Sequence, residues 1–194
     1  IDHCRHIEKA LSGIDHLSCY AVKANANREI LQILSREGIG ADAGSVGEMQ
    51  LALNAGFPPA KITFSGVGKR DDEIEFALTN NIMSLNVESA EEINVVNTFA
   101  AKHNVKARIL LRINFDIKSG THPYITTGQR HNKFGVDKSE AVGVLTQAAA
   151  LSHIEILGIH SHIGSQITSG EVFAAAAREM VAYIGNIRKQ GIAV

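Results

Sequence analysis

The sequence predicts an α/β fold built from parallel βα units, arranged as a (β/α)₈ barrel of the TIM type of which about six units are complete. Short apolar or β-branched runs alternate with amphipathic stretches along the chain, a pattern typical of strands followed by helices. The first four runs begin near residues 17, 39, 61 and 82, so the repeat is about the length of one βα unit. Such strict alternation implies parallel strands joined by right-handed crossovers.

The strands are predicted from runs that are apolar without polar alternation, such as Ile109-Leu110-Leu111. Runs of this kind are typical of parallel strands that are covered on both faces. The predicted strands cover residues 17–22, 39–43, 61–65, 82–86, 106–114 and 155–162, and a seventh begins at residue 192.

The helices are predicted from apolar residues three and four positions apart. Asp71 and Asp72 suit the positive end of one helix dipole, and Ser89 with Glu92 has the spacing of a capping box. Gly38 suits the end of the first of these helices. The predicted helices cover residues 29–36, 47–54, 71–79, 88–103, 139–151 and 171–190.

Two architectures fit these units, a closed barrel and an open doubly wound sheet. No Gly-x-Gly-x-x-Gly follows the first strand, which weakens the dinucleotide-binding form of the open sheet. Six units with a seventh begun favour the barrel, because eight units need roughly 250 residues. We therefore expect the chain to end before its barrel closes.

The composition of the chain limits its number of domains, its binding partners and its cellular compartment. The chain has 194 residues, 45% of them hydrophobic, which is enough for one domain with a substantial core. The net charge of −1 provides no basic field for nucleic acid, and no apolar run approaches the roughly 18 residues of a membrane helix. Cys4 and Cys19 have neither the density of a disulfide scaffold nor metal-ligand spacing, which indicates a reducing cytoplasm.

Polar residues follow the predicted strand ends, where a barrel places its site. An irregular segment, residues 114–137, follows the fifth strand and is interpreted as a site loop. The candidate site residues are Lys23 after the first strand, Asp42, Ser45 and Glu48 after the second, Arg112 in the fifth, and His160, His162 and Ser165 at the end of the sixth.

Each candidate has more than one interpretation. Lys23 is either a reactive amine or a lysine that solvates a strand end, and Asp42 and Glu48 are either site acids or a turn former and a first-turn helix acid. His160 and His162 lie two apart on a strand, so they are a metal pair, an imidazole beside a flat cofactor, or core histidines.

The residues together favour one cofactor. Gly164-Ser165 resembles part of an anion site, although the same pair is common in ordinary loops. A rim lysine, two histidines and a phosphate site suggest pyridoxal phosphate, whose aldehyde needs an amine and whose phosphate needs hydrogen-bond donors.

Eight short motifs follow one another along the chain. They are Tyr20-Ala-Val-Lys-Ala-Asn25, Gly40-Ala-Asp42 with Ser45 and Gly47-Glu48, Phe64-Ser-Gly66 with Lys69, Asn86-Val-Glu-Ser89, Leu111-Arg-Ile-Asn114, Thr121-His-Pro-Tyr-Ile125 with Thr127-Gly128, Asn132-Lys-Phe-Gly135 and Gly158-Ile-His-Ser-His-Ile-Gly-Ser-Gln166. In this order they resemble the motifs of the fold type III pyridoxal-phosphate decarboxylases over essentially the whole chain. Within the family they favour the branch that converts meso-2,6-diaminopimelate to L-lysine, the last step of lysine biosynthesis.

The resemblance implies specific roles. Lys23 would form the aldimine with the cofactor, His162 would stack against its ring, and Ser165 would reach its phosphate. Asp42 and Glu48 would belong to the pocket wall. The resemblance further implies a C-terminal β-domain, a homodimer with shared active sites, and no bound metal.

The family's glycine-rich phosphate loop and its substrate-binding arginine correspond to positions beyond residue 194. We therefore expect residues 1–194 to be the N-terminal part of the barrel domain, inactive alone. Other interpretations stay open: a decarboxylase acting on carboxynorspermidine or another basic amino acid, a metal-dependent barrel hydrolase using His160 and His162, or a non-catalytic relative that binds the cofactor.

Overall fold

The structure, a computed structural model, describes residues 1–115 and 134–194. These residues form two compact units, Ile1–Leu85 and Asn86–Val194. Most of the predicted site loop, residues 114–137, lies outside the described residues.

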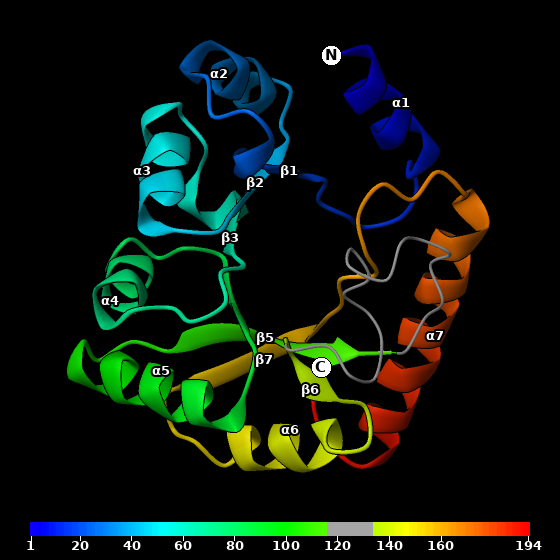
Figure 1. The fold of residues 1–194 in the computed structure, drawn as a ribbon. Coiled ribbons are helices and arrows are strands. Elements are labelled where there is room, and N and C mark those ends of the chain that lie inside the picture. The colour runs from blue at the N-terminus through cyan, green and yellow to red at the C-terminus, as the bar shows by residue number, and fades with distance from the viewer. Residues whose placement is uncertain (116–133) are drawn as a thin grey trace. The chain divides into compact units, whose positions relative to one another are not determined.

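The first unit is a run of parallel βα units. In register, Cys19 pairs with Gly40, Ala41 with Ile62, and Thr63 with Ser84. Helices α2, α3 and α4 lie along the same side of strands β1 to β3 (Figure 1). The elements are α1 (Asp2–Ala10), β1 (Cys19–Ala21), the 3₁₀ turn η1 (Val22–Ala24), α2 (Arg28–Arg36), β2 (Gly40–Ala43), α3 (Val46–Asn54), the 3₁₀ turn η2 (Pro59–Lys61), β3 (Ile62–Phe64), α4 (Asp71–Thr79) and the start of β4 (Ser84–Val87).

The core of the first unit lies between these strands and helices. All three residues of β3 are buried, as expected of a parallel strand with both faces covered. Leu31, Met49 and Ile74, one from each of the helices α2, α3 and α4, are almost fully buried. Apolar burial of this kind is the main force that holds each helix to the sheet.

The second unit is organised around β5, the longest strand. Strand β5 pairs in parallel with both β6 and β7, and Arg112 lies beside His160 in the β5–β7 register. Its core includes Ile109, Leu111 and Leu145. The elements after β4 are α5 (Ala90–Lys102), β5 (Ala107–Asn114), β6 (Val136–Asp137), α6 (Ala141–Ala149), β7 (Ile154–His160) and α7 (Gly170–Lys189).

The predicted class of parallel α/β units is confirmed, and α4 has the predicted bounds. The capping prediction for α5 also holds, because the Ser89 hydroxyl accepts a hydrogen bond from the Glu92 amide at 3.1 Å. Helix α1 and strand β6 were not predicted.

Three predicted strands end earlier than expected, and one of them is β3, which stops at Phe64. Strand β1 stops at Ala21 because Val22–Ala24 turn into a 3₁₀ helix, and β7 stops at His160. The prediction of a strand from residue 192 is wrong, because the described residues 192–194 form no strand. A strand requires backbone pairing with a neighbour, and the Val194 carbonyl instead accepts hydrogen bonds from the Arg188 side chain at 2.9 and 2.7 Å.

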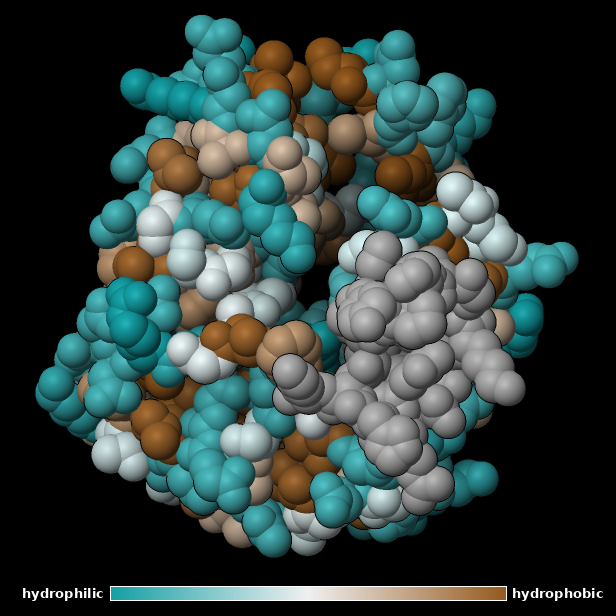
Figure 2. Space-filling model, in the orientation of Figure 1, coloured by the Kyte–Doolittle hydropathy of each residue, from teal (hydrophilic) through white to brown (hydrophobic). Residues whose placement is uncertain are grey.

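The surface is mixed in polarity. On the face drawn in Figure 2, hydrophilic residues predominate, with apolar residues scattered between them, as is normal for a folded protein. Among the described residues, no helix has both the length and the apolar character needed to cross a membrane.

Gly66 provides a test of the packing between β2 and β3. A Cβ atom at Gly66 would lie 2.6 Å from the Gly44 carbonyl oxygen, so Gly66→Ala forces the backbone apart. We expect it to lower the free energy of unfolding by about 1–3 kcal/mol, as measured by urea denaturation.

Gly185→Ala is the matched control, because a Cβ atom at that helical position meets nothing within 4 Å. We expect it to raise stability by about 0.5–1 kcal/mol. Equal effects of the two substitutions would contradict the close approach of Gly66 to Gly44.

Candidate active site

Lys23 lies just after β1, in the turn η1. Val22 is fully buried, whereas Lys23 is exposed, so the turn anchors the chain and leaves the amine accessible. The Tyr20 hydroxyl donates to the Asn25 carbonyl at 3.4 Å and closes the turn. The Asn27 side chain then caps α2, accepting the Glu29 amide at 2.9 Å. The lysine is therefore presented at the carboxyl end of a strand, as predicted.

Asp42 lies at the same edge of the first unit. It pairs with Ala21 in the β1–β2 register, two residues before Lys23. The Ser65 hydroxyl donates to the Asp42 carboxylate, and the Ser65 amide donates to the Ala43 carbonyl at 2.8 Å. Ser65 therefore fixes the direction of the Asp42 carboxylate. The sequence indicated Ser65 only as part of the Phe64-Ser-Gly66 motif, without this partner.

Cys19 also lies close to Asp42. Cys19 is exposed as a residue, but partial desolvation of its thiol, assisted by the negative charge of Asp42, raises the pKa of the thiol to about 11. The thiol is therefore neutral near pH 7, which makes it a poor nucleophile.

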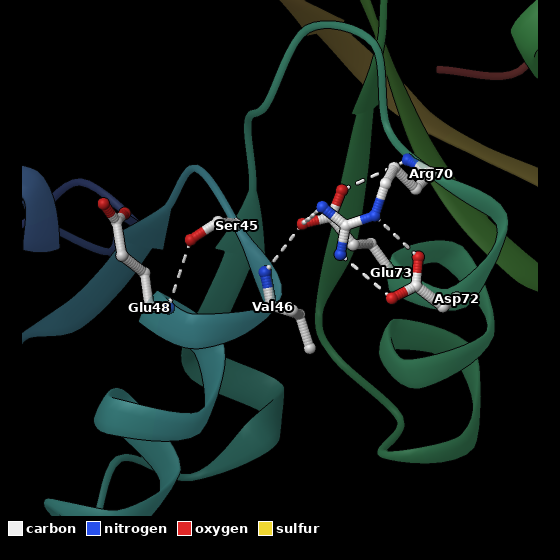
Figure 3. Close-up of polar contacts among 6 residues, drawn as sticks. All are labelled: Ser45, Val46, Glu48, Arg70, Asp72 and Glu73. Atoms are coloured by element: carbon white, nitrogen blue, oxygen red, sulfur yellow. Dashed lines mark hydrogen bonds and ion pairs between the residues drawn. The ribbon is translucent and has the colours of Figure 1, made fainter.

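Ser45 and Glu48 cap the start of α3 (Figure 3). The Ser45 hydroxyl accepts a hydrogen bond from the Glu48 amide at 3.3 Å, and the Glu48 carboxylate accepts one from the Gly44 amide at 2.7 Å. Each residue thus satisfies a backbone donor that the helix itself leaves unpaired. These contacts give both residues a structural role at the β2–α3 turn.

Glu73 joins the starts of two helices, and sequence reasoning missed it. Its carboxylate accepts the amides of Val46 and Arg70, each at 3.1 Å, so it links the first residue of α3 to the start of α4 (Figure 3). The Glu73 side chain is only 8% exposed. The sequence analysis named only its neighbours Asp71 and Asp72 as helix-dipole acids, and no spacing indicated the contact of Glu73 with α3.

In the second unit, Arg112 forms a buried ion pair with Glu88. The Arg112 Nη1 donates to the Glu88 Oε1 at 2.7 Å, and the two side chains are 8% and 10% exposed. The guanidinium carbon lies 5.6 Å from the centroid of the Phe134 ring. Loss of one partner from such a pair costs about 3–5 kcal/mol, because the other charge stays buried. The sequence indicated Arg112 as a site residue, and Glu88 only as part of the Asn86-Val-Glu-Ser89 motif, without this pairing.

His160, His162 and Ser165 lie at the end of β7 and in the turn that follows. His160 is the last residue of the strand, so the alternation of strand side chains does not extend to His162. Gly164 has φ +126°, a conformation that suits glycine, and its Cβ-free backbone allows the turn. Ser165 is exposed and the two histidines are half-buried.

Each unit, taken by itself, carries groups of the kinds that a phosphorylated aldehyde cofactor uses. The first unit presents a lysine amine at a strand end. The second unit holds a buried guanidinium in β5, and Arg112 pairs in register with His160 at the end of β7. Amine, hydroxyl, imidazole and guanidinium are the donor types that such a cofactor needs. Among the described residues, no cluster of three or more His, Cys, Asp or Glu side chains could hold a metal ion.

All of residues 1–194 match the family described as "Pyridoxal-dependent decarboxylase, pyridoxal binding domain". The chain belongs to the pyridoxal-dependent decarboxylases. Among relatives of this chain, the diaminopimelate decarboxylase of Pseudomonas aeruginosa is 44% identical over 185 residues, 95% of this chain and 45% of that protein. That of Vibrio cholerae is 44% identical over 190 residues, 98% of this chain and 46% of that protein.

Solved structures agree with this decarboxylase family. Diaminopimelate decarboxylase from Helicobacter pylori, complexed with L-lysine, matches with a TM-score of 0.94 and 42% identity over 98% of this chain and 48% of that one. The M. jannaschii enzyme, also complexed with L-lysine, matches with a TM-score of 0.87 and 33% identity over 100% of this chain and 45% of that one.

The comparisons confirm three predictions about the chain. They are the suspected family, the fold class of a partial (β/α)₈ barrel, and pyridoxal phosphate as the cofactor of the domain. The chain spans about half the length of the curated relatives it matches. The roles of Lys23, Asp42, His162 and Ser165 stay predictions.

Glu48 offers a test between capping and catalysis. We expect Glu48→Ala to lower the free energy of unfolding by about 1–2 kcal/mol, because the Gly44 amide loses its acceptor. Glu48→Gln keeps an acceptor oxygen and should cost less than half of that. Urea denaturation measures both, and loss of activity with unchanged stability in Glu48→Ala would contradict the capping role.

Proposed function

We propose that the whole protein to which this chain contributes is a pyridoxal-phosphate-dependent decarboxylase that converts meso-2,6-diaminopimelate to L-lysine. The observation that carries the proposal is the family match over residues 1–194, together with Lys23 held at the carboxyl end of β1. The relatives named diaminopimelate decarboxylase, and those solved with L-lysine, support this substrate and product.

In this proposal three side chains of residues 1–194 contact the cofactor directly. Lys23 attaches to the cofactor, His162 lies against its ring, and Ser165 donates to its phosphate, as the family motifs imply. When bound, the cofactor supplies a conjugated ring that accepts the electrons left by departing carbon dioxide. Asp42, oriented by Ser65, belongs to the pocket wall at the same edge as Lys23.

The proposal extends to assembly and location. Residues 1–194 would form the N-terminal part of the barrel domain, and the whole protein would act as a homodimer with shared active sites. The thiols of Cys4 and Cys19 form no disulfide, which fits a reducing cytoplasm. The substrate would be a small amino acid, and the proposed reaction would require neither nucleic acid nor a membrane as a binding partner.

Lys23→Ala in the full-length protein tests the proposal. We expect it to abolish the visible absorbance of lysine-bound cofactor and the release of carbon dioxide from meso-diaminopimelate, because no other amine takes its place. Absorbance spectra and a carbon dioxide assay measure the two effects.

Lys106→Ala is the matched control, because Lys106 is also exposed but directly precedes β5, at the opposite end of a strand. It should leave both signals unchanged. If Lys23→Ala keeps the absorbance band and the activity, the proposed function is wrong.

A further inference from the structure

The Glu88–Arg112 pair lies at the carboxyl ends of two strands. Glu88 directly follows β4, and Arg112 lies near the end of β5. The two side chains share one hydrogen bond, from Nη1 to Oε1. Arg112 Nε and Glu88 Oε2 are buried and have no hydrogen-bond partner among the described residues. Buried polar atoms are nearly always paired, so these two atoms require an explanation.

Phe134 and Gly135 cover the same guanidinium. The Asn114 side-chain amide donates to the Phe134 carbonyl at 2.7 Å, and Ile113 pairs with Val136 in the β5–β6 register. Gly135 has φ +80°, and a Cβ atom there would lie 3.0 Å from the Arg112 carbonyl oxygen. The backbone is therefore pinned to β5, and the Phe134 ring is held against the guanidinium.

These contacts restrict Arg112 on two sides. Glu88 binds one end of the guanidinium, and the Phe134 ring lies 5.6 Å from its central carbon. The Nε–H group is left as a buried donor, in a strand whose register places Arg112 beside His160. A planar cation fixed in this way is preorganised to donate to an oxyanion.

A purely structural role would explain why Glu88 pairs with Arg112, but not why the pair is held by a single hydrogen bond. Arginine and a carboxylate usually pair through two parallel hydrogen bonds, which satisfies more of the polar atoms. Here a single contact, made on only one side of the guanidinium, leaves one buried atom of each partner without a hydrogen bond among the described residues. That arrangement is expected if the guanidinium must also serve a third group.

We infer that Glu88 and Phe134 are positioning residues that orient the Arg112 guanidinium toward an anionic oxygen of a ligand, either a phosphate or a carboxylate. The inference rests on the proposed function, since the cofactor carries a phosphate and the substrate carries carboxylates. Glu88 and Phe134 act through Arg112 and touch neither ligand.

The test uses Phe134→Leu and Glu88→Asp in the full-length enzyme. Phe134→Leu removes the ring without changing any charge, and Glu88→Asp keeps the charge but withdraws it from Nη1. Phe99→Leu and Glu179→Asp are matched controls in the same unit, because Phe99 is half-buried beside Lys102 and Glu179 pairs with Lys138 through side chains that are each 42% exposed.

Two measurements distinguish the sources of the oxyanion. If Arg112 binds phosphate, both variants weaken pyridoxal-phosphate binding to the apoprotein by about tenfold, while binding of pyridoxal itself is unchanged. If Arg112 binds a substrate carboxylate, the KM for meso-diaminopimelate rises by a similar factor and cofactor binding is unchanged. Either effect should disappear when Arg112→Met is already present.

The inference would be overturned if Phe134→Leu and Glu88→Asp both kept the wild-type affinity for pyridoxal phosphate and the wild-type KM for meso-diaminopimelate. A combined Glu88→Met, Arg112→Met variant guards against misfolding, because apolar replacement of a buried ion pair is often tolerated. We expect it to unfold near the wild-type temperature but to bind the oxyanion ligand weakly; wild-type affinity in that variant would also overturn the inference.

The Lys23→Ala spectrum separates this inference from the proposed function. If Lys23→Ala loses the cofactor band while the Arg112, Glu88 and Phe134 variants behave like the wild type, only the inference fails. If Lys23→Ala keeps the band and the activity, the proposed function fails.

Discussion

Parallel strand pairing is the constraint on which the rest of this structure depends. A parallel neighbour can be reached only by a crossover, so every strand is followed by a segment that returns along the sheet. The carboxyl ends of paired strands therefore lie at one edge. In the first unit that edge carries Lys23, Asp42 and Ser65, and in the second it carries Arg112 and His160.

Side chains at these edges are fixed mainly by backbone amides and by each other. Glu48 and Glu73 accept amides at the starts of α3 and α4, which settles how each helix leaves its strand. Ser65 holds Asp42, and Glu88 holds Arg112. The two acidic candidates of the sequence thus differ, because Glu48 accepts a backbone amide whereas the Asp42 carboxylate is held by the Ser65 hydroxyl.

The order of strands and helices could be predicted because burial imposes a period on the sequence. Strand ends could not, since a strand stops where its pairing stops: β1 gives way to η1 at Val22, and residues 192–194 have no strand partner in the described residues. Lys23, Asp42 and Arg112 were found from their positions after or within strands. The contacts of Asp42 with Ser65 and of Arg112 with Glu88 could not be predicted, because contacts between residues 23 or 24 positions apart leave no periodic trace.

The short 3₁₀ turn at Val22–Ala24 has a consequence for how the lysine is aimed. Along a strand, side chains alternate between two faces, so a residue's direction is dictated by whether its position is odd or even. A 3₁₀ turn rotates by a third of a circle per residue, which releases Lys23 from that parity while Val22 stays anchored in the core. The reach of the amine can therefore be tuned by small changes in the turn, without repacking the strand that supports it.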